Sequence, residues 1–234
     1  MTNLLDSTRE RILAAAEELF ARTGVATTSL RAITALARVN LAAVNYHFGS
    51  KDGLVEAVYR RRLEPLNRAR LSNLEKVEAA AGGAPPALED VMEAFIVPVV
   101  KLGQDPAQGG PTVMRLLGQT HTEAAGYFRT YFAGEYREVL ERYQDVLARI
   151  LPDLPPEQIK NRLAFLVGAM TYPIAERQLL ELLTGEEVCR QDIDTMMKQL
   201  VPFAVAGFRA PPVSSRRKRA SSTRKKSSST RSRQ

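Results

Sequence analysis

The chain has 234 residues, of which 44% are hydrophobic and 25% are charged, so it is long enough to bury a substantial core as a soluble globular protein. The single cysteine, Cys189, excludes an intrachain disulfide framework and favours a reducing compartment. No apolar run approaches the roughly 20 residues of a membrane-spanning helix, and the first ten residues lack a signal-peptide pattern. These absences predict a cytoplasmic protein without a membrane partner.

The positive charge is concentrated at the C-terminal end of the chain. The formal net charge is +7, but ten of the 33 basic residues lie from Arg209 onwards, where there is no acidic residue. Residues 1–208 therefore carry 23 basic against 26 acidic residues. From Ala210 the chain is rich in Ser, Thr, Pro, Arg and Lys and nearly devoid of apolar side chains. This composition predicts a disordered basic tail over residues 210–234.

Apolar residues recur at helical spacing from the start of the chain. A first helix is predicted over residues 7–23, ending before Gly24. A second helix begins after Thr27 or Thr28, whose hydroxyls can cap free amides, and runs to Ala37. Asn40 is a suitable N-cap for a third helix over residues 41–48, and Ser50 for a helix that begins at Lys51.

The remainder of the chain is also predicted to be helical. The fourth helix runs over residues 51–80, with a bend or interruption at Pro65. Further helices are expected over residues 87–102, 111–120, 123–151, 156–184 and 191–208, separated by breaks that contain glycine or proline. Because no segment alternates like a run of strands, the predicted fold class is all-α.

The first 48 residues have the outline of a helix-turn-helix, since the second and third helices are separated by a short turn. A DNA-reading helix needs an outer face small enough to enter the major groove, with phosphate-binding groups at its margins. The third helix offers Leu41, Ala42, Ala43, Asn45 and Tyr46 on such a face, whereas Val39, Val44 and Phe48 are predicted to pack inward.

The segment TTSLRAITALARVNLAAVNYHFGSKDGLVEAV resembles the DNA-binding signature of TetR-family regulators, in which an aromatic-rich element precedes Ser-Lys at the start of the fourth helix. Here that element is Asn45-Tyr46-His47-Phe48-Gly49-Ser50-Lys51. The resemblance implies a helix-turn-helix DNA-binding domain over residues 1–50 and a helical ligand-sensing and dimerisation domain over residues 51–209. The NLAAVNYHFGSK pattern also looks like the fatty-acid-responsive PsrA-like subgroup.

The resemblance assigns roles within the first domain. Arg31 matches a position that reaches a base edge, with guanine as its natural target, although a phosphate contact or simple solvation explains it as well. Leu41, Ala42 and Ala43 match base-facing positions that contact thymine methyl groups. Thr28, Tyr46, His47 and Lys51 match or neighbour phosphate-contacting positions.

Two positions depart from the family pattern. The turn usually contains glycine where this chain has Arg38, so the backbone there either avoids a positive φ or accepts strain. Asn45 replaces the usual first aromatic residue, and it either bonds adenine or remains a surface amide.

The second domain contains many large apolar residues. In the family this domain binds an inducer between helices, which implies a small apolar effector such as a fatty acid or acyl-CoA. The candidate lining residues are Met92, Phe95, Val99, Met114, Leu117, Phe128, Phe132 and Met170.

The last two helices carry apolar faces, including Leu163, Leu166, Met170, Val201 and Phe208. In the family the corresponding helices form a four-helix bundle with a second copy, which implies a homodimer that reads a palindromic operator. A monomeric core explains the same faces.

An enzyme, a non-specific DNA-binding protein and an activator are the alternatives to a repressor. An enzyme is disfavoured because the chain has two histidines, no Cys/His metal spacing, no nucleophile elbow and no phosphate loop, and no cofactor is implied. A non-specific, architectural DNA-binding protein driven by the basic tail is the alternative to a sequence-specific repressor. The sequence does not distinguish a repressor from an activator.

Overall fold

The computed structural model describes residues 2–105, 109–119, 126–175, 182 and 193–213, and all the regular structure in these residues is helical. The all-α prediction is therefore confirmed. The helices are α1 (Thr2–Thr23), α2 (Leu30–Ala37), α3 (Leu41–Phe48), α4 (Lys51–Ala80), α5 (Leu88–Gln104), α6 (Gly110–Gln119), α7 (Gly126–Ile150), α8 (Pro156–Ala175) and α10 (Ile193–Arg209).

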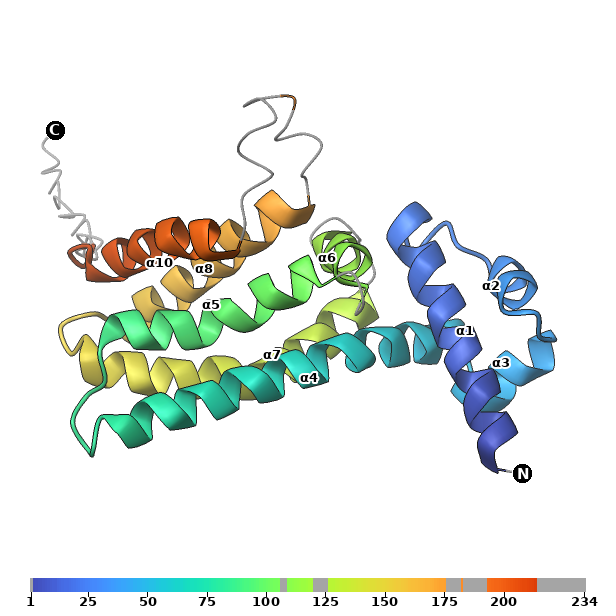
Figure 1. The fold of residues 1–234 in the computed structure, drawn as a ribbon, viewed down its shortest axis with the longest axis horizontal. Helices are drawn as coiled ribbons and strands as arrows, with labels where there is room; N and C mark the ends of the chain where they lie inside the picture. Colours follow the sequence, from blue (N-terminus) through green and yellow to red (C-terminus); the bar gives the residue numbers. More distant parts are fainter. Residues whose placement is uncertain (1, 106–108, 120–125, 176–181, 183–192, 214–234) are drawn as a thin grey trace, which may run out of the picture.

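The helices form a small N-terminal domain and a larger helical bundle, which are joined by α4 (Figure 1). Helices α1, α2 and α3 pack against one another at one end of the molecule, and the N-terminal end of α4 packs against α1 and α3. The rest of α4 runs along a bundle that it shares with α5, α7, α8 and α10. Because α6 contacts both α1 and α8, the small domain and the bundle touch at two places, through α4 and through α6.

Side-chain caps define the starts of the three helices that follow α1. The Ser29 hydroxyl accepts a hydrogen bond from the Ala32 amide at 3.1 Å, the Asn40 carboxamide oxygen accepts from Ala43 at 2.9 Å, and the Ser50 hydroxyl accepts from Gly53 at 3.0 Å. Each bond satisfies an amide that has no partner within its helix. The caps predicted at Asn40 and Ser50 are confirmed.

The cap of α2 was predicted one or two residues too early. Ser29, and neither Thr27 nor Thr28, caps this helix. The Thr27 hydroxyl donates to the Thr23 carbonyl, and the Thr28 hydroxyl donates to the Gly24 carbonyl at 2.6 Å. Both threonines therefore close the end of α1 instead.

Several helix ends also differ from the predicted ones. α1 begins at Thr2, five residues before the predicted start, and α8 is described as far as Ala175. Pro65 lies within a continuous α4, so it does not interrupt the helix. Its missing amide is tolerated on an exposed side of the helix, where solvent can bond the freed carbonyl. Cys189 and the rest of residues 183–192 lie outside the described residues.

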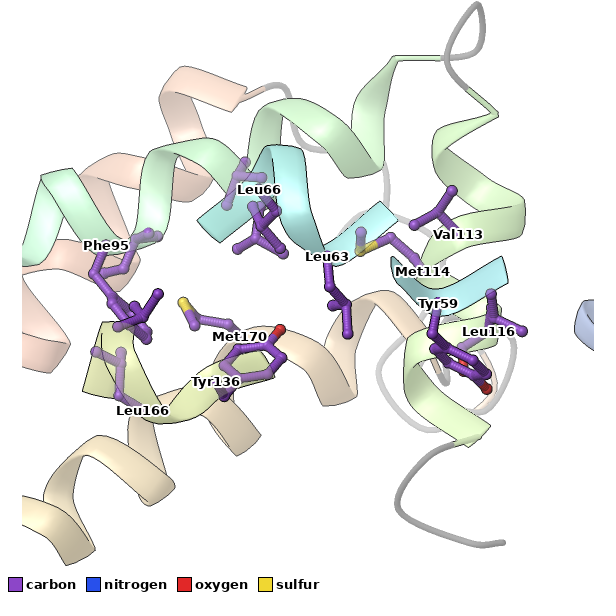
Figure 2. Close-up of a cluster of buried hydrophobic side chains, with 14 of the residues drawn as sticks. Tyr59, Leu63, Leu66, Phe95, Val113, Met114, Leu116, Tyr136, Leu166 and Met170 are labelled. Atoms are coloured by element: carbon purple, nitrogen blue, oxygen red, sulfur yellow. The ribbon is translucent and has the colours of Figure 1, made fainter. Parts of the chain in front are cut away.

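A single apolar core extends through both ends of the molecule. In the small domain it contains Ile12, Phe20, Ile33 and Val44, all of which are fully buried. In the bundle, side chains from α4, α5, α6, α7 and α8 converge (Figure 2), including Leu63, Phe95, Met114, Tyr136 and Met170. This continuous packing is the physical connection between the two domains.

Residues 210–213, at the start of the predicted disordered tail, make defined contacts with α8. Residues 210–213 lie along α8, where the Arg162 guanidinium donates to the carbonyl oxygens of Phe208, Ala210 and Pro211 at 2.7–3.1 Å. The Gln158 carboxamide both donates to the Val213 carbonyl and accepts from its amide. These hydrogen bonds offset the entropy lost when the segment is ordered, since it has few apolar side chains to bury. Residues 214–234 lie outside the described residues.

None of the helices described is both long and apolar enough to cross a membrane.

Candidate nucleic-acid interface

α3 has one anchored face and one exposed face. Val44 is fully buried against α1 and α2, whereas Leu41, Ala42, Asn45 and Tyr46 are exposed. Tyr46 is the most exposed of these side chains, at 74%. Ala43 is half-buried and packs against the core, so it contributes less to the outer face than the sequence suggested. The exposed residues of α3 carry apolar, aromatic and carboxamide groups and no charge, and such groups can contact thymine methyl groups and adenine in a major groove.

The turn before α3 adopts the conformation that glycine usually supplies. Arg38 has φ 53° and ψ 50°, and it is the one non-glycine residue with positive φ in the described part of the chain. Its amide bonds the carbonyls of Thr34 and Ala35, so the residue closes α2 in a left-handed cap. Of the two possibilities for this turn, the chain accepts the strain.

Three consecutive aromatic rings end α3. The Tyr46 and His47 rings meet edge to face, with centroids 5.0 Å apart, and the His47 and Phe48 rings are 6.1 Å apart. Phe48 is half-buried, and the Arg9 guanidinium of α1 lies 5.5 Å from its ring centroid. Phe48 therefore anchors the row inside the domain, while Tyr46 projects outward with His47 half-buried between them.

The start of α4 depends on two glycines. Gly49 has φ 73°, and a Cβ on Gly53 would lie 2.2 Å from the Phe48 carbonyl oxygen, so a side chain at position 53 has no room. Lys51 occupies the first turn of α4, and its Nζ lies 3.4 Å from the Ala26 carbonyl oxygen. A cationic residue thus occupies the first turn of α4, and both its charge and the free amides of a helix N-terminus attract an anion.

The remaining predicted DNA contacts occupy different environments. Arg31 is exposed in the first turn of α2. Thr28 is buried, and its hydroxyl lies 2.9 Å from that of Thr23 as well as bonding Gly24. The Thr28 side chain is thus engaged within the domain, whereas the neighbouring Ser29 is exposed at the N-terminus of α2.

The predicted effector-lining residues lie in the bundle core. Met92, Phe95 and Val99 of α5, Met114 of α6 and Met170 of α8 are all buried. Figure 2 shows Phe95, Met114 and Met170 within the same apolar cluster. The side chains of Leu117, Phe128 and Phe132 lie outside the described residues.

Two features of the structure were not predicted from the sequence. Arg70 is fully buried in the bundle, although a charged residue is normally exposed. Its spacing from the buried Leu63, Leu66 and Leu74 places it on the inner face of α4, and that periodicity was the available signal. The Glu17 and Arg62 side chains form a bidentate ion pair between α1 and α4, for which the sequence carries no local signal.

Two family models match the chain. Residues 12–58 match the model described as bacterial regulatory proteins, tetR family, and residues 93–207 match the tetracyclin repressor-like C-terminal domain. The first match contains α2, α3 and the exposed face described above, and the second contains most of the bundle.

The chain is also similar to curated relatives over a short stretch. An HTH-type transcriptional repressor of Mycobacterium tuberculosis and an HTH-type transcriptional regulator of Mycobacterium bovis are each 55% identical over 47 residues. That stretch is 20% of this chain and 25% of each relative, so the match spans a quarter of the relatives' length.

Solved structures share the fold along most of the chain. The SmeT–triclosan complex has a TM-score of 0.60 at 24% identity, covering 85% of this chain and 90% of that one. A transcriptional regulator from Aquifex aeolicus has 0.54 at 18% identity, and the fatty acid degradation regulator FadR from Bacillus halodurans has 0.57 at 13%. Each of these two matches covers 85% of this chain and 98% of the other protein's chain.

Both domains thus match the same family, one of regulators and not of enzymes, and the fold agrees over 85% of the chain. The chain belongs to the TetR family of bacterial regulatory proteins.

Proposed function

We propose that this protein acts in the cytoplasm as a homodimeric repressor, which binds a palindromic DNA operator and leaves it when a small apolar effector binds. The observation that carries the proposal is the exposed face of α3, where Leu41, Ala42, Asn45 and Tyr46 face solvent above the buried Val44. Small and apolar side chains of this kind contact thymine methyl groups, and Asn45 can bond adenine.

Phosphate contacts around α3 would set its position in the groove. Tyr46 and His47 lie at one end of the helix, Lys51 follows at the start of α4, and Arg31 lies on α2. The Thr28 side chain is buried, so we assign any phosphate contact there to its backbone or to Ser29. Phosphate contacts hold the register of the protein, while base contacts select the sequence.

The proposed dimer uses side chains that the protomer leaves exposed. Phe165 of α8 is 73% exposed and Phe203 of α10 is 67% exposed. The apolar residues that the sequence pattern suggests for this interface, among them Leu166, Val201 and Phe208, are buried within the protomer. A second copy that covers both phenylalanines would bring two α3 helices to successive major grooves, roughly 34–36 Å apart.

The proposed effector binds in the bundle. Buried Phe95, Met114 and Met170 come from three helices and form an apolar, polarisable cluster, which suits an apolar ligand. Two proteins of the same fold are described as a triclosan complex and as a fatty acid degradation regulator, which supports an apolar effector such as a fatty acid or acyl-CoA here.

Operator binding is tested by selecting bound duplexes from random DNA and measuring their affinity by fluorescence anisotropy. We expect a palindrome that binds about a thousandfold or more tightly than random duplex. The double variant Tyr46→Ala with Lys51→Ala should lose this binding, whereas Lys76→Ala, at an exposed site on α4 within the bundle, should retain it. Equal affinity for every duplex would favour the non-specific alternative.

The dimer is tested by light scattering of Phe165→Glu with Phe203→Glu, which should be monomeric and should bind the operator weakly. The double variant Arg137→Glu with Lys160→Glu serves as a control, because it also makes exposed positions of α7 and α8 more negative. A dimer that survives the phenylalanine changes would contradict the proposed interface. The position of the operator relative to its promoter decides between repression and activation.

A further inference from the structure

Arg70 lies in the middle of α4 with its guanidinium inside the bundle. The residue is 1% exposed, and its Nε donates to the Phe95 carbonyl oxygen at 3.0 Å. The guanidinium carbon is 4.1 Å from the Phe95 ring centroid and 5.7 Å from that of Tyr136. Figure 2 shows these two rings within the apolar cluster. The cation is therefore held between aromatic groups of α5 and α7.

The contacts of Arg70 leave part of its charge unmet. No carboxylate in the described part of the chain forms an ion pair with it, and its buried Nη1 has no hydrogen-bond acceptor there. A buried guanidinium needs acceptors for its donors and an opposite charge to offset the loss of hydration. The aromatic faces supply only part of that attraction. By contrast, Arg62 and Arg142 each bond a glutamate.

We propose that the Arg70 guanidinium is the anion-binding group of the effector site, and that the effector is an apolar monocarboxylic acid. A carboxylate matches the planar fork of arginine and can accept from Nη1. The surrounding Leu66, Phe95 and Tyr136 side chains suit the apolar part of such a molecule. One buried positive charge favours a monoanion over a phosphate. A free acid is favoured over a thioester, whose acyl carbonyl is uncharged.

The position of Arg70 connects this site to DNA binding, and this step rests on the proposed function. Arg70 and Lys51 both lie on α4. The N-terminal end of this helix, which begins at Lys51, packs against α1 and α3. The Arg70 Nε bond also reaches α5, and the Tyr143 hydroxyl of α7 donates to the Arg70 carbonyl oxygen at 3.0 Å. A ligand that bonds the guanidinium therefore acts on the helix that carries the DNA-binding domain.

The test is calorimetric titration of the full-length protein with octanoate, dodecanoate, hexadecanoate and cinnamate, each compared with its matched alcohol. At least one acid should bind about tenfold or more tightly than its alcohol, since hydrogen bonds to charged groups have about that effect. Arg70→Met should lose this preference without weakening alcohol binding. Arg149→Met removes an exposed guanidinium that bonds Glu78 and should keep the preference.

A second measurement needs no variant. Carbon NMR of carboxyl-labelled acid bound to the unaltered protein should show that the carboxyl group stays ionised at a lower pH than in water, because the guanidinium stabilises its anion. The inference is overturned if no acid is preferred over its alcohol, if Arg70→Met retains the preference, or if the bound carboxyl group ionises at a higher pH than in water.

Operator binding in the same samples separates the two proposals. If the acid binds through Arg70 and releases the operator, both stand. If sequence-specific DNA binding is absent, the proposed repressor function fails while the titrations still decide the anion site. If the protein binds its operator but no acid is preferred, the site fails and the repressor function stands.

Discussion

The Arg11 guanidinium of α1 donates to the Arg38 carbonyl oxygen at 2.7 Å and to the Ala37 carbonyl oxygen at 2.5 Å. These carbonyls belong to the end of α2, where no helical amide remains to bond them. A cation there also opposes the negative end of the helix dipole. Arg11 thus fastens the turn of the helix-turn-helix to the first helix, and the orientation of α3 depends on a contact between residues far apart in the sequence.

Replacing Arg11 by Met should therefore loosen this turn. We expect the free energy of unfolding to fall by about 1–3 kcal/mol, because two hydrogen bonds from a charged group are lost, one part-buried and one exposed. Chemical denaturation measures the loss. Arg22→Met, at an exposed position of the same helix, should change stability by no more than about 0.5 kcal/mol. Equal losses in the two variants would show that the Arg11 contacts do not hold the turn.

The left-handed conformation of Arg38 makes this position sensitive to side-chain shape. Arg38→Gly and Arg38→Asn should leave stability unchanged or raise it by up to about 1 kcal/mol, since both residues tolerate positive φ. Arg38→Val should lower it by about 1–2 kcal/mol because a β-branched side chain is strained there. Thermal unfolding of the three variants measures the order. A Val variant as stable as the Gly variant would argue against a strained turn.

The contrast between Arg38 and Asn40 illustrates what can be predicted from the sequence. Caps at Asn40 and Ser50 follow from local chemistry, so the limits of α3 and the start of α4 were predicted correctly. At Thr27, Thr28 and Ser29, three residues could cap the same helix. The choice depends on the end of α1, where the two threonine hydroxyls bond carbonyls. Local pattern alone cannot decide such a competition.

The bundle was harder to predict for a different reason. The apolar residues of α5, α8 and α10 were identified, but periodicity does not tell whether an apolar face meets the same chain or a second copy. The structure buries Leu166 and Phe208 within the protomer and exposes Phe165 and Phe203. Arg70 was not predicted because charge normally indicates exposure. Its burial depends on the rings of Phe95 and Tyr136, which are distant in sequence.

Gly53 allows the close approach of α4 to the end of α3. Gly53→Ala would place a Cβ 2.2 Å from the Phe48 carbonyl oxygen, so the turn between the helices must move. We expect a loss of about 1–3 kcal/mol in the free energy of unfolding and weaker operator binding. Gly134→Ala in α7 meets no atom within 4 Å and should be neutral or stabilising. Unchanged operator affinity in Gly53→Ala would show that the turn accommodates the methyl group.

The bidentate ion pair between Glu17 and Arg62 joins the small domain to α4. Arg62 Nε donates to Glu17 Oε2 at 2.9 Å and Arg62 Nη2 to Glu17 Oε1 at 2.5 Å, and the Glu17 side chain is only 7% exposed. Arg62→Met should cost about 3–5 kcal/mol, because it leaves the buried Glu17 carboxylate without its partner, and Glu17→Gln should cost less, because Arg62 is only half-buried.

The double variant Glu17→Gln with Arg62→Met should cost less than the sum of the two single changes. A double-mutant cycle in denaturant measures this coupling. The exposed pair Arg68 and Glu64 on α4, treated in the same way, should show coupling of no more than about 0.5 kcal/mol. Simple additivity at Glu17 and Arg62 would mean that the contact does not couple the two helices.

Tyr143 should make the bundle sensitive to alkaline pH. Burial raises the pKa of its hydroxyl above the ordinary value of 10.0, and the Arg70 charge offsets only part of this effect. The neutral hydroxyl donates to the Arg70 carbonyl oxygen. Because the pKa is higher in the folded than in the unfolded chain, the contribution of Tyr143 is complete below about pH 10 and is lost as the pH rises above it.

Tyr143→Phe should therefore have two opposite effects. At neutral pH it loses a hydrogen bond and about 1 kcal/mol of stability. Above about pH 10 its stability should fall less steeply than that of the unaltered protein, by up to about 1.4 kcal/mol for each pH unit. Denaturation curves from about pH 8 to pH 11 measure both effects. Tyr46→Phe, at the exposed end of α3, is the matched control and should follow the unaltered protein. Parallel pH profiles for Tyr143→Phe and the unaltered protein would show that Tyr143 ionises as readily in the folded chain as in the unfolded one.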